Sequence, residues 1–328
     1  MFIGQTLTTE VRAGTSFALL AALAGVTGAP RDELAPELAD ALRAVGDAEG
    51  ETWLNLFGIP LDAAANTADE LIRAVDAMDP VELRLHLLGR HAWSWCSLAG
   101  VDDIEAAAHG DTSAATRLLE HPRYYGGHAR SSLATLLPLD PPETRNRIAD
   151  AIAAGSRSLV DDATRRLAAA ADTAESLLQA RPASVAIEGL TNGYRYVPEP
   201  EAERVVLVPH LEPTLPLVLA QHRGARVIAY LAASEGSSED RLLALGRALA
   251  DPKRVEILAL VGRGVGRAAE LVEATALTRS TVHHHLAQLR EAGLVTLEGN
   301  ARAYTYVARR EAADEAAALV ADITRKGE

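Results

Sequence analysis

Apolar residues recur at three- and four-residue spacing along much of residues 1–182. This period is that of an amphipathic helix, and it predicts a mainly helical N-terminal domain. Asp79-Pro80 has the pattern of a helix N-cap followed by proline at the first helical position. Residues 141–182 are read as one long helix, or as two helices broken near Gly155, with a proline closing the segment.

Between residues 183 and 233 the pattern changes to short β-branched or aromatic runs. These runs are 183–190, 194–198, 204–209 and 226–232. Asn-Gly, proline and glycine-rich breaks separate them, and TNGY at 191–194 is a reasonable hairpin turn. They predict a small antiparallel sheet that completes or links the N-terminal domain. The polar stretch SEGSSED at 234–240 marks the boundary to a second domain at 238–328.

The second domain is predicted to contain several helices followed by a hairpin. Asp251 and Pro252 begin one helix, and a shorter helix covers about 267–274. Thr278 caps the next helix, which Gly293 ends. Strands at 294–298 and 302–307 then flank a short turn, and a last helix spans 311–325. This order is that of a winged helix-turn-helix. The expected fold class is mainly α with a small α+β component.

The helix after Thr278 contains three consecutive histidines, His283, His284 and His285. At about 100° per residue, three apolar residues of this helix form one buried stripe. These residues are Val282, Leu286 and Leu289. His285 flanks the stripe, whereas His283 and His284 face outward. Because consecutive helical residues diverge, the three histidines cannot ligate one metal ion together.

The segments LADPKRVEILALV and STVHHHLAQLREAGLV, with the strand at 304–307, resemble the ArsR/SmtB family of winged-helix transcription regulators. The resemblance covers about residues 245–310. It implies a homodimeric repressor that binds an operator in double-stranded DNA and is released by a ligand, often a metal ion. It also implies that the last helix helps to form the dimer.

The resemblance places the start of the exposed helix in the major groove and the wing tip near phosphate or the minor groove. The candidate DNA-binding residues are Arg279, Ser280, Thr281, His283, His284, Gln288, Asn300 and Arg302. Protonation of His283 and His284 predicts tighter DNA binding below about pH 6.5. The metal-sensing members carry a Cys-x-Cys pattern that this chain lacks, so their metal sites are not transferred, and we expect no metal and no cofactor.

The length of 328 residues fits two domains, and the charge differs between them. The net charge is −13, with 19 basic against 32 acidic residues before Glu239 and 13 against 13 from there on. The acidic N-terminal part is expected to repel phosphate. The near-neutral second domain leaves open a winged helix used as a protein-interaction module, although its arginines could form a positive face.

The N-terminal part contains few candidate catalytic or binding groups. His86, His91 and Cys96 lie at five-residue spacing, which on one helix separates neighbours by about 140°. We interpret them as helix-end polar groups and a packing cysteine. The segment HPRYYGGHAR at 121–130 is interpreted either as part of a ligand pocket or as a tight loop. The candidate pocket residues are Trp93, Tyr124, Tyr125 and His128.

Phosphate-binding loops, nucleophile elbows and HExxH are missing from the sequence, so we expect no enzyme. The N-terminal domain is expected to sense a small-molecule effector or a partner. An enzyme or a metal-sensing domain fused to a winged helix remains the alternative.

The apolar run from Phe17 to Val26 is too short to span a bilayer. It lacks the preceding basic region of a signal peptide, although GVTGAP at 25–30 resembles a cleavage site. We expect a cytoplasmic protein without membrane contact.

Overall fold

The computed structural model describes residues 7–26, 30–46, 50–160, 163–232, 238–300 and 303–325. The chain forms two compact units. Unit 1 consists of Met1–Glu175 and Pro200–Ala232, and unit 2 of Ser176–Glu199 and Ala233–Glu328. The resemblance to a cleavage site at 25–30 and the boundary expected at 234–240 fall partly outside the described residues.

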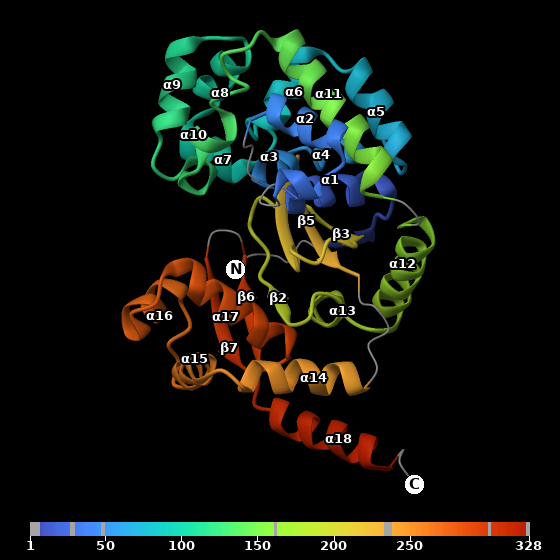
Figure 1. Cartoon of the computed structure of the whole chain (residues 1–328), viewed down its shortest axis with the longest axis vertical. Coiled ribbons are helices and arrows are strands. Elements are labelled where there is room, and N and C mark those ends of the chain that lie inside the picture. The colour runs from blue at the N-terminus through green and yellow to red at the C-terminus, as the bar shows by residue number, and fades with distance from the viewer. Residues whose placement is uncertain are drawn as a thin grey trace. The chain divides into compact units, whose positions relative to one another are not determined.

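Unit 1 combines many short helices with one four-stranded sheet (Figure 1). Its helices are α1 Thr15–Gly25, α2 Pro36–Ala44, α3 Gly50–Asn55, α4 Gly58–Asp62, α5 Ala68–Ala77, α6 Pro80–Leu87, α7 Trp93–Ala99, α8 Val101–Ala108, α9 Thr112–Glu120, α10 Ala129–Leu133 and α11 Pro141–Ser158, with 3-10 turns η2 Arg31–Glu33 and η3 Tyr124–Gly127. Its strands are β1 Thr8–Val11, β3 Arg204–His210, β4 Leu217–His222 and β5 Ala225–Leu231. Helix α12, Ala163–Ala180, leads into unit 2.

The sheet of unit 1 has the strand order β1-β3-β5-β4. Strands β1, β3 and β5 run parallel, and only β4 is antiparallel to its neighbour. Strands β3 and β5 are the two predicted strands that pair directly, and because they run parallel the expected antiparallel sheet is wrong. Strands β3 and β5 are buried almost throughout, as parallel strands covered on both faces are, and their sequences accordingly lack a polar alternation.

Helix α1 is the central helix of unit 1, since every residue from Ser16 to Ala24 is buried. Helix α11 packs on it through Gly155, where a Cβ atom would lie 2.9 Å from Leu23 Cδ2. The chain stays helical through Gly155, and α11 ends at Ser158. Residues 141–182 therefore do not form one long helix, and the first helix ends three residues after Gly155. Among the described residues, we find no helix both long and apolar enough to cross a membrane.

Unit 2 contains the elements predicted for a winged helix and two further ones (Figure 1). Its elements are α13 Ala183–Leu190, β2 Tyr194–Tyr196, α14 Ser238–Leu249, α15 Pro252–Gly262, α16 Ala268–Thr275, α17 Arg279–Glu291, β6 Val295–Gly299, β7 Tyr304–Ala308 and α18 Ala312–Arg325. The predicted bounds of α16, α17, β6, β7 and α18 agree with the structure within two residues. The fold class is confirmed as mainly α with small sheets.

The segment 183–190 is a helix, α13, and the predicted strand there is wrong. Asn192 and Gly193 do adopt the positive φ angles of a tight turn, 52° and 89°. Their turn joins α13 to β2 and does not form a hairpin. Strand β2 pairs in parallel with β6, which pairs with β7 in antiparallel fashion, giving the order β2-β6-β7.

Candidate nucleic-acid interface

Helix α17 begins at a well-formed cap. The Thr278 hydroxyl accepts a hydrogen bond from the Thr281 backbone N–H at 3.2 Å, which satisfies one of the free amides of the first turn. The turn before it contains Ala276 in the left-handed region, with φ 55° and ψ 24°. At the other end Gly293 has φ 70°, as expected for a glycine that follows a helix.

The buried face of α17 is the predicted stripe. Val282, Leu286 and Leu289 are fully buried, and they pack in one cluster with Ile257 of α15 and Leu271 of α16. This packing fixes which face of α17 points outward. His285 is also buried, at 7% exposure, and burial is the main cause that lowers its pKa. Its predicted place beside the core is confirmed.

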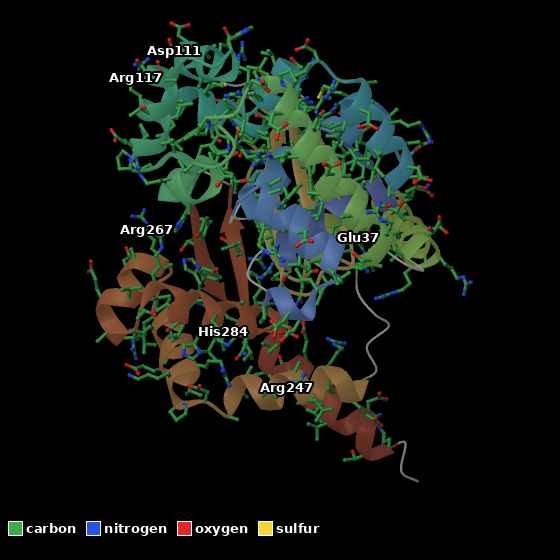
Figure 2. All side chains as sticks on the ribbon, turned by 45° about the horizontal axis from the view of Figure 1, so that its top comes forward. Glu37, Asp111, Arg117, Arg247, Arg267 and His284 are labelled. Carbon is green, nitrogen blue, oxygen red and sulfur yellow. The ribbon has the colours of Figure 1, made fainter. Side chains whose placement is uncertain are left out.

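The outward face of α17 contains His284 and Gln288, whose side chains lie 3.0 Å apart (His284 Nε2 to Gln288 Nε2; Figure 2 shows His284). His284 is exposed as predicted, but His283 is half-buried. Burial, followed by the nearby Arg279 guanidinium, lowers the pKa of His283. Its positive charge is therefore expected at a lower pH than the sequence alone suggests.

The first turn of α17 presents the remaining candidates of this helix. Arg279 is exposed. Thr281 is half-buried, and its hydroxyl lies 2.7 Å from that of Thr278. The side chain of Ser280 lies outside the described residues.

The wing is the β6–β7 hairpin, and Asn300 holds its loop. The Asn300 N–H donates to the Ala303 carbonyl at 3.0 Å, and its side-chain oxygen accepts from the Ala303 N–H at 3.3 Å. Its amide nitrogen donates to the Val197 carbonyl at 3.2 Å. These contacts position the wing tip, where Arg302 lies outside the described residues.

Strand β2 supports the wing from the other side, a role that the sequence pattern did not reveal. The Leu297 N–H donates to the Gly193 carbonyl at 2.8 Å, and the Tyr194 hydroxyl donates to the Gly299 carbonyl at 3.0 Å. Tyr194 is fully buried. The only local signal was the Asn-Gly turn before β2.

Fewer arginines contribute exposed positive charge near α17 than the arginine content of unit 2 suggests. Arg290 is 7% exposed and donates to the Thr191 carbonyl at 3.1 Å, and burial lowers its pKa. Arg254 donates to the carbonyls that end α14. Arg263, Arg267 and Arg279 are exposed, and Figure 2 shows Arg267 on unit 2.

The residues of the predicted ligand pocket belong to the core of unit 1 or to its surface. Tyr124 and Tyr125 are fully buried and packed against Trp95. Their hydroxyls donate to the carbonyls of Leu88 and Leu87, so neither side chain presents a surface to a ligand. Trp93 is half-buried, with the Arg226 guanidinium 5.1 Å from its ring centroid. His128 is exposed.

Helices α15 to α17 and the wing define a winged helix-turn-helix protein. The family model described as "Bacterial regulatory protein, arsR family" matches residues 251–296. The HTH-type transcriptional regulator YgaV of Escherichia coli is 31% identical over 88 residues, which are 26% of this chain and 89% of YgaV. The chain therefore belongs to the ArsR family.

The HTH-type transcriptional regulator CmtR of Mycobacterium tuberculosis is 49% identical over 63 residues, and the protein of the same name in Mycobacterium bovis matches equally. The match covers 19% of this chain and 53% of CmtR, so the chain spans about half the length of these relatives. No solved structure matches the chain.

Proposed function

We propose that the protein is a DNA-binding transcriptional regulator, a homodimeric cytoplasmic repressor whose unit 1 senses an effector or a partner. The observation that carries the proposal is the outward face of α17. Its apolar stripe is buried in unit 2, while Arg279 and His284 remain exposed. A helix with that exposure fits the major groove of B-DNA.

The relatives support this proposal because both are transcriptional regulators by name, and the family model matches residues 251–296, within the winged helix. In a symmetric dimer two copies of α17 would read a palindromic operator, one DNA turn apart. Arg302 and Ser280 remain predicted contacts.

The test is fluorescence anisotropy with the DNA upstream of the protein's own coding region, over a salt series. We expect Arg279→Ala and His284→Ala each to weaken binding about tenfold, because each removes one groove or phosphate contact. Arg279→Ala should also reduce the salt dependence by about one released counterion if it contacts phosphate.

Arg166→Ala is the matched control, since it removes the same charge from an exposed position on α12 of unit 1. It should leave affinity and salt dependence nearly unchanged. Equal and weak binding by all four proteins would refute sequence reading by α17 and favour a protein-interaction module.

A further inference from the structure

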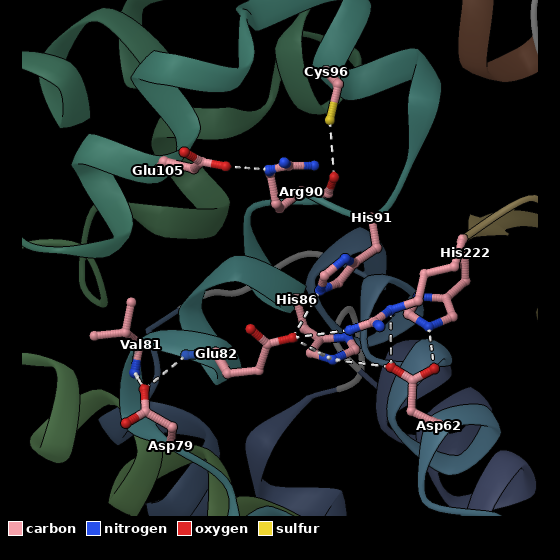
Figure 3. Close-up of polar contacts among 11 residues, drawn as sticks. Asp62, Asp79, Val81, Glu82, His86, Arg90, His91, Cys96, Glu105 and His222 are labelled. Carbon is pink, nitrogen blue, oxygen red and sulfur yellow. Dashed lines mark hydrogen bonds and ion pairs between the residues drawn. The ribbon is translucent and has the colours of Figure 1, made fainter.

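Unit 1 brings three histidines and two carboxylates together from distant parts of the chain (Figure 3). Asp62 ends α4, Glu82 and His86 lie on α6, and His91 follows that helix. His222 is the last residue of β4. The centroids of the three imidazole rings are 4.7–5.3 Å apart.

Sequence reasoning placed His86 and His91 on one helix, and this placement is wrong. Helix α6 ends at Leu87, and Gly89 has φ 69°. The Arg90 N–H donates back to the Leu85 carbonyl at 2.9 Å, so the chain turns and returns His91 toward His86. Cys96 does not join them, because its thiol contacts the Arg90 carbonyl.

The nitrogen atoms of the three rings point toward the two carboxylates. His91 Nε2 lies 3.0 Å and His86 Nε2 3.8 Å from Glu82 Oε1. His222 Nε2 lies 2.7 Å from Asp62 Oδ1, and His86 Nε2 is 3.9 Å from Asp62 Oδ2. Around a tetrahedral zinc ion with bonds of about 2.0–2.1 Å, ligand atoms are roughly 3.3 Å apart. The observed spacings bracket that value.

The surrounding backbone holds these rings in place. The Arg223 N–H donates to the His91 carbonyl at 3.0 Å, which ties the β4–β5 turn to the segment after α6. Gly58 allows the His222 ring to approach, since a Cβ there would lie 2.2 Å from His222 Nδ1. The site is therefore preorganised by the fold.

The histidines of the cluster are more deeply buried than its carboxylates. The side chains of His86 and His222 are 1% and 3% exposed, His91 is 16% exposed, and both carboxylates are 34% exposed. His86 Nδ1 is buried and has no hydrogen-bond partner among the described residues. An ion at Nε2 would leave the ring proton on Nδ1, so this unpaired nitrogen does not itself favour an ion. The site is supported instead by the spacing of its ligand atoms.

Arg223 occupies the charged side of the cluster. Its guanidinium lies 3.2 Å from Asp62 and 3.2 Å from Glu82, and its side chain is 52% exposed. Two carboxylates so close together need a counter-charge. Arg223 supplies that charge, and its exposed position lets it withdraw when another cation arrives.

We propose that unit 1 binds one divalent transition-metal ion through Glu82, His86 and His91, with a fourth coordination position open to water. Asp62 and His222 border this site. The atoms of the first three residues all lie within 4.8 Å of one another. Imidazole and carboxylate ligands suit zinc and its neighbours in the first transition series. Metal binding does not depend on DNA binding, whereas a role for the ion as effector rests on the proposed function.

The test uses the full chain, freed of metal with a chelator and titrated with Zn²⁺ against a chromophoric competitor. We expect one Zn²⁺ per chain, and at least a tenfold loss of affinity in Glu82→Gln, which keeps the size of the side chain. Arg223→Gln should bind Zn²⁺ several-fold more tightly, because the competing cation is gone. His109→Gln changes an exposed histidine of the same unit and should match the wild type.

A purely structural network predicts a different set of results, namely no stoichiometric Zn²⁺ in the wild type and no gain in Arg223→Gln. Either finding would overturn the proposal. Co²⁺ absorption in the visible region gives a second readout, which should report four-coordinate geometry in the wild type and change in Glu82→Gln. Anisotropy on the same samples separates the two proposals: Zn²⁺ binding without any DNA binding would refute the proposed function alone.

Discussion

Ala276 adopts a left-handed backbone conformation in the turn between α16 and α17. For a residue with a Cβ atom this conformation costs about 1–2 kcal/mol, whereas glycine adopts it freely. No sequence pattern indicated this conformation, because an alanine in a turn does not by itself predict a positive φ angle. The structure shows that the helix-turn-helix retains this local cost in the turn before α17.

Ala276→Gly is expected to stabilise unit 2 by about 0.5–1 kcal/mol, because relief of the strain outweighs the larger chain entropy of glycine in the unfolded state. Denaturant unfolding followed by circular dichroism measures the change. Ala274→Gly is the matched control. Ala274 lies within α16, where glycine is unfavourable, so this variant should lose stability. A loss of stability in both variants would contradict the assignment of strain to Ala276.

Individual histidines illustrate which residue positions can be predicted from sequence. The period of α17 was enough to place His285 at the core and His284 outside, because both positions depend on one continuous helix. His86 and His91 depend on where α6 ends and on a strand more than a hundred residues away. Gly89 was the available signal for the helix end, and nothing local indicated His222.

At the scale of elements, the secondary structure of short apolar runs was harder to predict than that of long helices. Residues 183–190 contain β-branched residues, yet Pro182 begins a helix there. A run of eight residues fits either state, and tertiary packing decides between them. Helices with a cap and a long apolar period, such as α15 and α17, were located correctly because their end signals are local.

Helices α14 and α18 contact each other and expose large apolar side chains. Leu243 of α14 is 59% exposed and Val320 of α18 is 47% exposed. In the proposed dimer these side chains are covered by the partner copy. We expect Leu243→Asp and Val320→Asp each to shift the protein from dimer to monomer, because a buried carboxylate at an apolar interface is costly. Sedimentation velocity at a fixed concentration measures the shift.

Val185→Asp provides the control for this prediction, since Val185 of α13 is 43% exposed in the same unit. It should leave the dimer intact. A wild-type protein that sediments as a monomer would refute the dimer itself, and equal dissociation by all three variants would refute the assignment of the interface to α14 and α18.

At the scale of the whole molecule, the chain passes between its units more than once. It leaves unit 1 after Glu175, contributes α13 and β2 to unit 2, and returns for β3 to β5 before it enters unit 2 again. Sequence patterns follow the chain in order, so they assigned residues 183–233 to one region. The pairing of β2 with β6 joins segments about a hundred residues apart, and no local pattern encodes it.

The stability of the wing is therefore expected to depend on β2, which lies before residues 238–328 in the chain. The Leu297 amide is bonded to the Gly193 carbonyl, which a fragment of residues 238–328 lacks. In that fragment the Leu297 amide should exchange with solvent far faster than in the full chain, as measured by NMR hydrogen exchange. The Tyr306 amide is the control, because its partner, the Gly266 carbonyl, stays in the fragment. Faster exchange at Leu297 relative to Tyr306 would establish β2 as part of the wing, whereas equal protection in both proteins would contradict the β2–β6 pairing. The same comparison decides at which residue a DNA-binding fragment of this chain has to begin. If the Leu297 amide loses protection, the wing is less stable in a fragment that starts at residue 238. The DNA affinity of that fragment would then be lower than that of the full chain.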